Sequence, residues 1–145
     1  MKHKYLLKIA FSFLLISGGG SYGQILTFEF SALAGNEATA NSNTNDVNLA
    51  SSTISRGAGL TASGNSGRFN ATSWATTSIA NAVSGEDYME FTITPNATFQ
   101  FSVSSITINL QRSASGPSAV ALRSSVDNYA SNLDAEKAIT DNTST

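Results

Sequence analysis

Apolar and polar residues alternate with a period of two along several short stretches of this chain. Such alternation is typical of β-strands that bury one face, and polar turn residues separate the stretches. The alternating apolar sets are Leu26, Phe28 and Phe30; Met89, Phe91 and Ile93; Phe99, Phe101 and Val103; and Ile106, Ile108 and Leu110, with Val120 and Leu122 in a further stretch. One apolar face in strand after strand predicts an all-β fold of two antiparallel sheets packed face to face.

The apolar phase changes from odd to even positions across Ser104 and Ser105. A regular strand cannot change phase without exposing its apolar side chains, so a bulge or a break is predicted there. The core predicted between the two sheets consists of Leu26, Phe28, Phe91, Ile93, Phe99, Phe101, Ile106, Ile108 and Leu122.

Three stretches do not follow the strand pattern. Residues 31–46 are small, polar and Asn-rich, which predicts a long surface loop, whereas residues 73–84 are compatible with one or two helical turns. Residues after Leu133 offer no apolar closing strand, and a sandwich that lacks one leaves an edge open. The interpretation is a domain truncated at its C-terminal side and prone to aggregate when alone.

The N-terminal residues have the layout of a secretory signal peptide. Three lysines precede or border an apolar run at residues 9–16, and Ser21 and Gly23 are small residues at the −3 and −1 positions of a cut before Gln24. The apolar run is far shorter than the roughly 20 residues that a membrane span needs. Residues 1–23 are therefore predicted to be removed, and the protein is predicted to be secreted or held at the cell surface.

Residues 24–145 are long enough for one domain and carry a net negative charge. Five cations against ten carboxylates leave a charge of −5, with no basic cluster that would attract nucleic acid or an anionic membrane. There is no cysteine, so the fold in an oxidising compartment depends on its apolar core rather than on disulfides.

The single histidine of the chain is His3, within the predicted signal peptide. The mature part thus lacks the side chains for Ser-His-Asp or Cys-His catalysis and for ordinary zinc sites. Glycoside hydrolysis needs only two carboxylates that flank a sugar bond. The candidates for such a pair are Glu29, Glu86, Asp87, Glu90, Asp127 and Asp134, but a solvated strand surface explains them as well, and we predict that the protein is not an enzyme.

No cofactor is predicted, apart from calcium, which takes oxygen ligands and needs neither Cys nor His. The candidate calcium ligands in polar loops are Glu37, Asp46, Glu86 and Asp87, without EF-hand spacing. Exposed aromatic rings can stack on sugars, which makes Trp74 and Tyr88 candidate ligand-binding residues, because Tyr88 falls on the polar phase of its strand. For Trp74, burial in the core is the favoured interpretation, because a lone tryptophan is more often buried than exposed.

Several stretches resemble a domain that recurs in secreted multidomain proteins of Bacteroidetes-like bacteria. The similar stretches are residues 26–30, 54–60, 69–74, 87–92, 110–117 and 121–127. The resemblance implies a jelly-roll sandwich similar to carbohydrate-binding modules, although this chain stops before the final strands of that domain. It also draws attention to Arg112 and Arg123, for which a ligand-binding role and a structural ion pair both remain open.

Three functions are compatible with the sequence. The first is an exported, non-catalytic binding or adhesion module, with glycans as the first ligand class to test. The second is a ligand-free spacer domain of a larger secreted or surface protein. The weakest is a fragment of a glycoside hydrolase.

Overall fold

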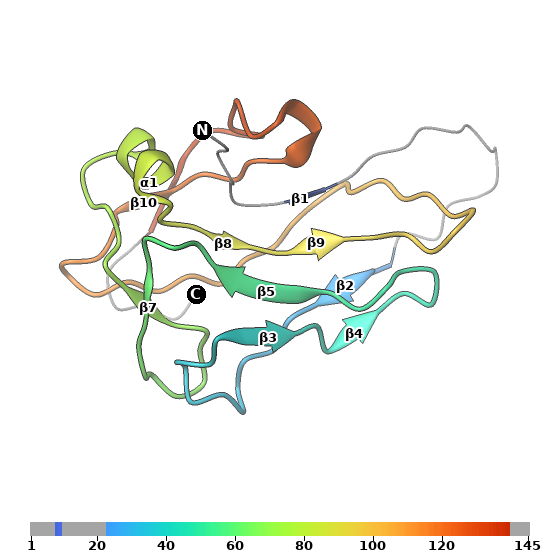
Figure 1. Cartoon of the computed structure of the whole chain (residues 1–145), viewed down its shortest axis with the longest axis horizontal. Coiled ribbons are helices and arrows are strands. Elements are labelled where there is room, and N and C mark those ends of the chain that lie inside the picture. The colour runs from blue at the N-terminus through green and yellow to red at the C-terminus, as the bar shows by residue number, and fades with distance from the viewer. Residues whose placement is uncertain (1–7, 10–22, 140–145) are drawn as a thin grey trace.

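The computed structural model describes residues 8–9 and 23–139 (Figure 1). The strands are short: β1 (Lys8–Ile9), β2 (Leu26–Thr27), β3 (Thr39–Asn41), β4 (Thr44–Asn45), β5 (Thr53–Arg56), β6 (Thr61–Ala62), β7 (Ala71–Thr72), β8 (Met89–Glu90), β9 (Thr92–Ile93), β10 (Ala119–Val120) and β11 (Lys137–Ala138). The helices are α1 (Ile79–Gly85) and a 3-10 turn, η1 (Ser125–Asp127).

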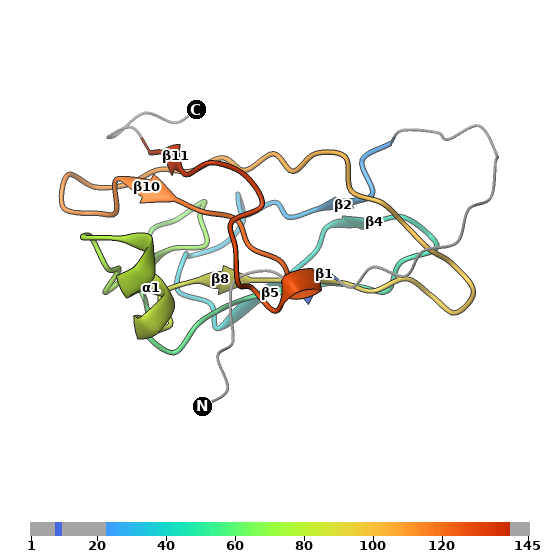
Figure 2. The same cartoon turned by 90° about the horizontal axis from the view of Figure 1, so that it is seen from above.

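The strands form several small sheets, and most of their pairs are antiparallel. The largest sheet has the order β3-β5-β8, while β2 pairs with β4, β6 with β7, and β10 with β11. The exception is β1, which pairs with β9 in parallel. Figure 2 shows β2 and β4 at one level and β5 and β8 at another. The all-β prediction is confirmed, and the jelly-roll sandwich stays a prediction.

The two strands predicted between residues 99 and 110 do not form. No strand is assigned from residue 96 to residue 110, and the described residues supply no partner ladder for this segment. Phe99 is 48% exposed and Ile108 is 50% exposed, so their placement in the predicted core is wrong. An alternating segment buries one face only when it pairs with a neighbouring strand, and the described structure assigns no such partner to this segment.

Residues 31–46, predicted as a loop, contain β3 and β4. Polar side chains support these strands: the Thr53 hydroxyl donates to Asn41 Oδ1 at 3.2 Å, and the Ser42 hydroxyl donates to the carbonyl of Ser52 at 3.0 Å. Such side-chain bonds let an Asn- and Ser-rich stretch pair with β5, and Ala40 is buried beneath it. A short strand also forms near the end of the described region, where β11 pairs with β10.

The helical turns predicted within residues 73–84 are confirmed by α1. The Ser78 hydroxyl accepts the backbone N–H of Asn81 at 3.1 Å, which satisfies a free donor of the first turn. Glu86 adopts the left-handed conformation with φ 60° and ends the helix, because its N–H bonds back to carbonyls of the last turn.

Aromatic rings form a chain through the core. Phe28 lies 5.4 Å from Phe91 in an edge contact and 6.3 Å from Phe30, and Phe30 lies 5.8 Å from Phe69. The contact between Phe28 and Phe30 confirms that these alternating residues share a face. Ile93 and Phe69 are buried, whereas Phe28 and Phe91 are half-buried.

Arg56 closes the far end of this aromatic chain. Its guanidinium lies 3.7 Å from the centre of the Phe69 ring and donates to the carbonyls of Gly35, Glu37 and Asn70. Burial lowers the pKa of Arg56 and the nearby Glu37 carboxylate opposes this shift. One cation at the end of β5 thus joins two loops that lie far apart in the sequence.

Candidate ligand-binding site

Trp74 borders a hollow just after β7. The indole Nε1 donates to the carbonyl of Ala71 at 3.0 Å, which holds the half-buried ring against its own strand. Ser73, directly before it, has φ 68°, a strained conformation for a residue with a side chain. The hollow, which we call the Trp74 hollow, has a volume of about 170 Å³ and is lined by Ala71, Thr72, Ser73, Trp74, Ser113, Ser115 and Gly116.

Arg112 holds the loop whose residues Ser113, Ser115 and Gly116 line the Trp74 hollow. Its Nη1 donates to the carbonyls of Ser113, Ala114 and Gly116 at 3.2–3.3 Å, and its Nε donates to the carbonyl of Ile139 at 3.0 Å. The planar guanidinium can make these bonds together because its donors have a fixed fork geometry. Arg112 is therefore a positioning residue that holds the Ser-rich loop against the C-terminal segment.

Tyr88 is buried, with 5% of its surface exposed, so its prediction as an exposed stacking residue is wrong. The physical reason is Gly57, whose N–H bonds to the carbonyl of Tyr88 at 2.8 Å. A Cβ at Gly57 would lie only 2.8 Å from the tyrosine ring, so the missing side chain leaves room for that ring. The alternation pattern fails at Tyr88 because Gly57, directly after β5, leaves room for its ring.

Arg123 lies in another part of the chain and does not line the Trp74 hollow. Its Nε donates to Asn132 Oδ1 at 2.8 Å and its Nη1 donates to the carbonyl of Tyr129 at 3.1 Å. These bonds hold the loop after η1. Arg112 and Arg123 thus both donate hydrogen bonds to carbonyl or amide oxygens of loops. The sequence left ligand binding and an ion pair open for them, but did not indicate this role.

Three of the four carboxylates proposed for calcium, those of Glu37, Asp46 and Asp87, accept hydrogen bonds from local backbone N–H groups, while Glu86 ends α1 through its backbone. Glu37 accepts the N–H groups of Ala34 and Gly35, and Asp46 accepts that of Asn48 at 2.8 Å. Asp87 accepts the N–H of Ala75 at 2.8 Å. Within residues 23–139 no three His, Cys, Asp or Glu side chains gather to hold one ion, so calcium binding stays a prediction without a formed site.

Hydrogen bonds set the pKa of Glu37. The bond from its own backbone N–H is the largest influence and lowers the pKa below the ordinary 4.5, while burial raises it and the donors of Ala34 and Gly35 lower it further. Glu37 is consequently charged at neutral pH, and its carboxylate interacts electrostatically with the Arg56 cation.

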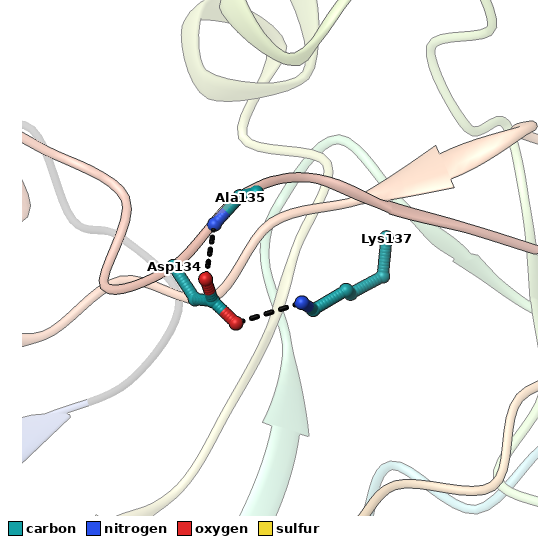
Figure 3. Close-up of polar contacts among 3 residues, drawn as sticks. All are labelled: Asp134, Ala135 and Lys137. Atoms are coloured by element: carbon teal, nitrogen blue, oxygen red, sulfur yellow. Dashed lines mark hydrogen bonds and ion pairs between the residues drawn. The ribbon is translucent and has the colours of Figure 1, made fainter.

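Two of the carboxylates considered for glycosidase chemistry, Asp134 and Asp127, also have local partners, whereas Glu90 Oε2 is buried and has no hydrogen-bond partner in the described part of the chain. Asp134 accepts the backbone N–H of Ala135 at 2.7 Å and pairs with the Lys137 ammonium at 2.7 Å (Figure 3). The bond to Lys137 is the main cause that lowers the pKa of Asp134. Asp127 accepts from Ser131 and Ala130, with the hydroxyl of Ser131 as the main cause of its lowered pKa. These two carboxylates are exposed and cap turns.

A second hollow lies where the sequence predicted core. It has a volume of about 180 Å³, and we call it the Phe99 hollow; it is lined by Ile25, Asp46, Asn48, Leu49, Pro95, Phe99, Gln100 and Phe101. Sequence reasoning missed it because Phe99 and Phe101 fit an alternating strand. The sequence signal for this hollow is Asn96, a turn-forming residue three positions before Phe99. The carbonyl of Asn96 accepts the N–H of Phe99 at 3.0 Å.

Comparisons with protein-family models, curated proteins and solved structures find no match to this chain. In the described part of the chain, no helix has the length and apolar character required to cross a membrane.

Proposed function

We propose that this protein is an exported, non-catalytic module that binds glycans, and that the Trp74 hollow is a binding site. The observation that carries the proposal is an indole fixed by its own hydrogen bond beside a wall of serine hydroxyls and backbone groups. A pyranose ring has an apolar C–H face and a rim of hydroxyls, so it needs both an aromatic surface and small polar groups. The Trp74 hollow offers the two side by side.

The size of the hollow limits the ligand. Sites for drug-sized ligands enclose about 300–1,000 Å³, which exceeds the 170 Å³ found here. A single sugar ring, at the end of a chain or as one unit along it, is the appropriate scale. The negative charge of residues 24–145 favours neutral over acidic sugars.

Glycan binding is tested with the purified chain against immobilised laminarin, xylan, galactan and mannan. Trp74 is the only tryptophan in the chain, so its fluorescence reports occupation of this hollow directly. Trp74→Phe keeps an aromatic ring, whereas Trp74→Ala removes it. We expect the alanine variant to bind at least about tenfold more weakly, equivalent to about 1.4 kcal/mol, with the phenylalanine variant in between.

Two outcomes contradict the proposal. If Trp74→Ala binds a polysaccharide as tightly as the unchanged chain, the Trp74 hollow is not a binding site. If none of the four polysaccharides is retained, the ligand-free spacer becomes the better function.

Export is tested by the intact mass of protein recovered outside the cell. We expect a chain that begins at Gln24; a secreted form that keeps Met1 would refute the cleavage. Removal of residues 1–23 also removes β1, and with it the parallel partner of Thr92 and Ile93 in β9.

A further inference from the structure

We propose that the Phe99 hollow is a second sugar-binding site, which makes one chain able to bind two glycan strands. This inference takes its ligand class from the proposed function but rests on other residues. The argument starts from the exposed ring. Phe99 is 48% exposed, and it borders a hollow with Phe101 as a second ring.

The backbone holds Phe99 in this position. Its N–H bonds to the carbonyl of Asn96 at 3.0 Å, which closes a tight turn. Thr98, immediately before it, has φ 75°, and a β-branched residue rarely adopts that left-handed conformation. Such strain persists only where the surroundings enforce it, and it is common at binding sites.

The two loops that form the hollow are tied to each other. Leu49 and Pro95 form an antiparallel bridge, and the N–H of Asn96 donates to the carbonyl of Asn48 at 2.8 Å. The Asn96 side chain adds a bond to the carbonyl of Val47 at 3.1 Å. The hollow therefore lies between two segments whose spacing is fixed before a ligand arrives, which lowers the entropic loss on binding.

Polar groups with spare bonding capacity line the same hollow. One carboxylate oxygen of Asp46 accepts the N–H of Asn48, and the described residues give the other oxygen no partner. The side-chain amides of Asn48 and Gln100 likewise have no hydrogen-bond partner within the described part of the chain. A carboxylate accepts from sugar hydroxyls, and amides both donate and accept.

This combination selects a sugar among the possible occupants. A purely apolar segment would cover Asp46 and the two amides without satisfying them, which is unfavourable. An anionic ligand would be repelled by the Asp46 carboxylate. A neutral pyranose meets Phe99 and Phe101 with its C–H face and Asp46, Asn48 and Gln100 with its hydroxyls.

The segments that line the two hollows lie toward opposite ends of the long axis (Figures 1 and 2). The loops that follow β4 and β9 form one end, while β7 and the loop before β10 lie at the other. One sugar chain in each hollow would leave both chains free to extend away from the protein. A monomer with this arrangement can cross-link polysaccharides, as an adhesion module requires.

The test is the stoichiometry of binding, measured by titration calorimetry of the full chain with the hexasaccharide of whichever polysaccharide it retains. We expect two hexasaccharides per chain, falling to one in Phe99→Ala and to one in Trp74→Ala. Asp46→Asn, which keeps the size of the side chain, should weaken the Phe99 site severalfold and leave the Trp74 fluorescence response unchanged. Val126→Ala is the matched control, because Val126 is an apolar side chain 61% exposed in η1 and lines neither hollow.

Cross-linking gives a second readout. The unchanged chain should precipitate the long polysaccharide, and either single alanine variant should lose this ability at least about tenfold, with near-UV dichroism used to confirm that each variant is folded. A stoichiometry of one that Phe99→Ala and Asp46→Asn do not alter would overturn the second site and leave the proposed function intact. Binding that Phe99→Ala abolishes and Trp74→Ala leaves unchanged would support the Phe99 hollow and refute the Trp74 hollow.

Discussion

Replacement of Arg56 by alanine should destabilise the fold more than loss of any other cation in residues 23–139. The guanidinium donates to three backbone carbonyls, those of Gly35, Glu37 and Asn70, and covers the ring of Phe69. These groups belong to separate loops, so no single neighbour can replace the cation. Truncation removes this donor from all three carbonyls, of which those of Gly35 and Asn70 keep a backbone N–H donor, and it uncovers the buried ring.

The expected loss can be estimated bond by bond. Each hydrogen bond is assigned about 1 kcal/mol net, the value of an ordinary bond and below the about 1.5–3 kcal/mol of a charged donor, because Arg56 is only half-buried. The contact with Phe69 adds about 0.5–1 kcal/mol. We therefore expect Arg56→Ala to lower the free energy of unfolding by about 3–4 kcal/mol, a large share of the roughly 5–15 kcal/mol of an ordinary domain. Arg56→Lys keeps the charge but not the fork of donors, and should lose about 2 kcal/mol.

The measurement is urea denaturation of the full chain, followed by Trp74 fluorescence and by far-UV dichroism. Arg68→Ala is the matched control, because Arg68 makes exposed hydrogen bonds to Gln111, Asn65 and Ser66. Its loss should change the stability by no more than about 0.5 kcal/mol. If Arg56→Ala and Arg68→Ala unfolded at the same urea concentration, the view of Arg56 as a joint between loops would be refuted.

Three further predictions concern close packing, a buried hydroxyl and pH. Gly57→Ala should destabilise by about 1–3 kcal/mol, because the added methyl group would lie 2.2 Å from a backbone carbonyl, whereas Gly64→Ala has open space and should unfold at the same temperature as the unchanged chain. Ser52→Ala should lose about 1–2 kcal/mol in the same urea assay, because the buried hydroxyl donates to the carbonyl of Thr92 at 2.7 Å; an unchanged midpoint would show that this bond is dispensable. Because the fold lowers the pKa of Glu37, its charged form stabilises the fold at pH values above the ordinary pKa of 4.5. This stabilisation is lost as the pH falls below 4.5 and the carboxylate becomes protonated. The difference in unfolding midpoint between the unchanged chain and Glu37→Gln should therefore shrink below pH 4.5, and a constant difference down to pH 3 would contradict this assignment.

The sequence predicted the parts of the fold that depend on local pattern. The strands at Leu26 and Ile93 and the helical turns near Ile79 follow from alternation and composition, and all three lie in or beside the predicted stretches. The local pattern does not specify which strands pair with each other. Residues 99–110 alternate as well as any other stretch, yet no neighbouring strand pairs with them in the described structure.

The candidate site was predictable only in part for the same reason. Trp74 was identified because exposed aromatic rings can stack on sugars, but its neighbours Ser113 and Ser115 come from about 40 residues further along the chain. Tyr88 was predicted to be exposed, but it is buried because Gly57, directly after β5, leaves room for its ring. In both cases the deciding contact joins positions that no local window includes.

The arginines show what replaces regular sheet structure in this domain. Arg56, Arg112 and Arg123 each place one guanidinium among carbonyls or amide oxygens of loops, and the chain has no cysteine to tie those loops covalently. Short strands leave many loop carbonyls without ladder partners, and a buried carbonyl needs a donor. A guanidinium supplies several donors from a single side chain, with a charge that burial does not remove. The loop at the Trp74 hollow is held in this way by Arg112, whereas the loops at the Phe99 hollow are held by backbone bonds between residues 48 and 96. Loss of Arg112 should consequently loosen the Trp74 hollow and leave the Phe99 hollow unaffected, because different interactions hold the loops of the two sites.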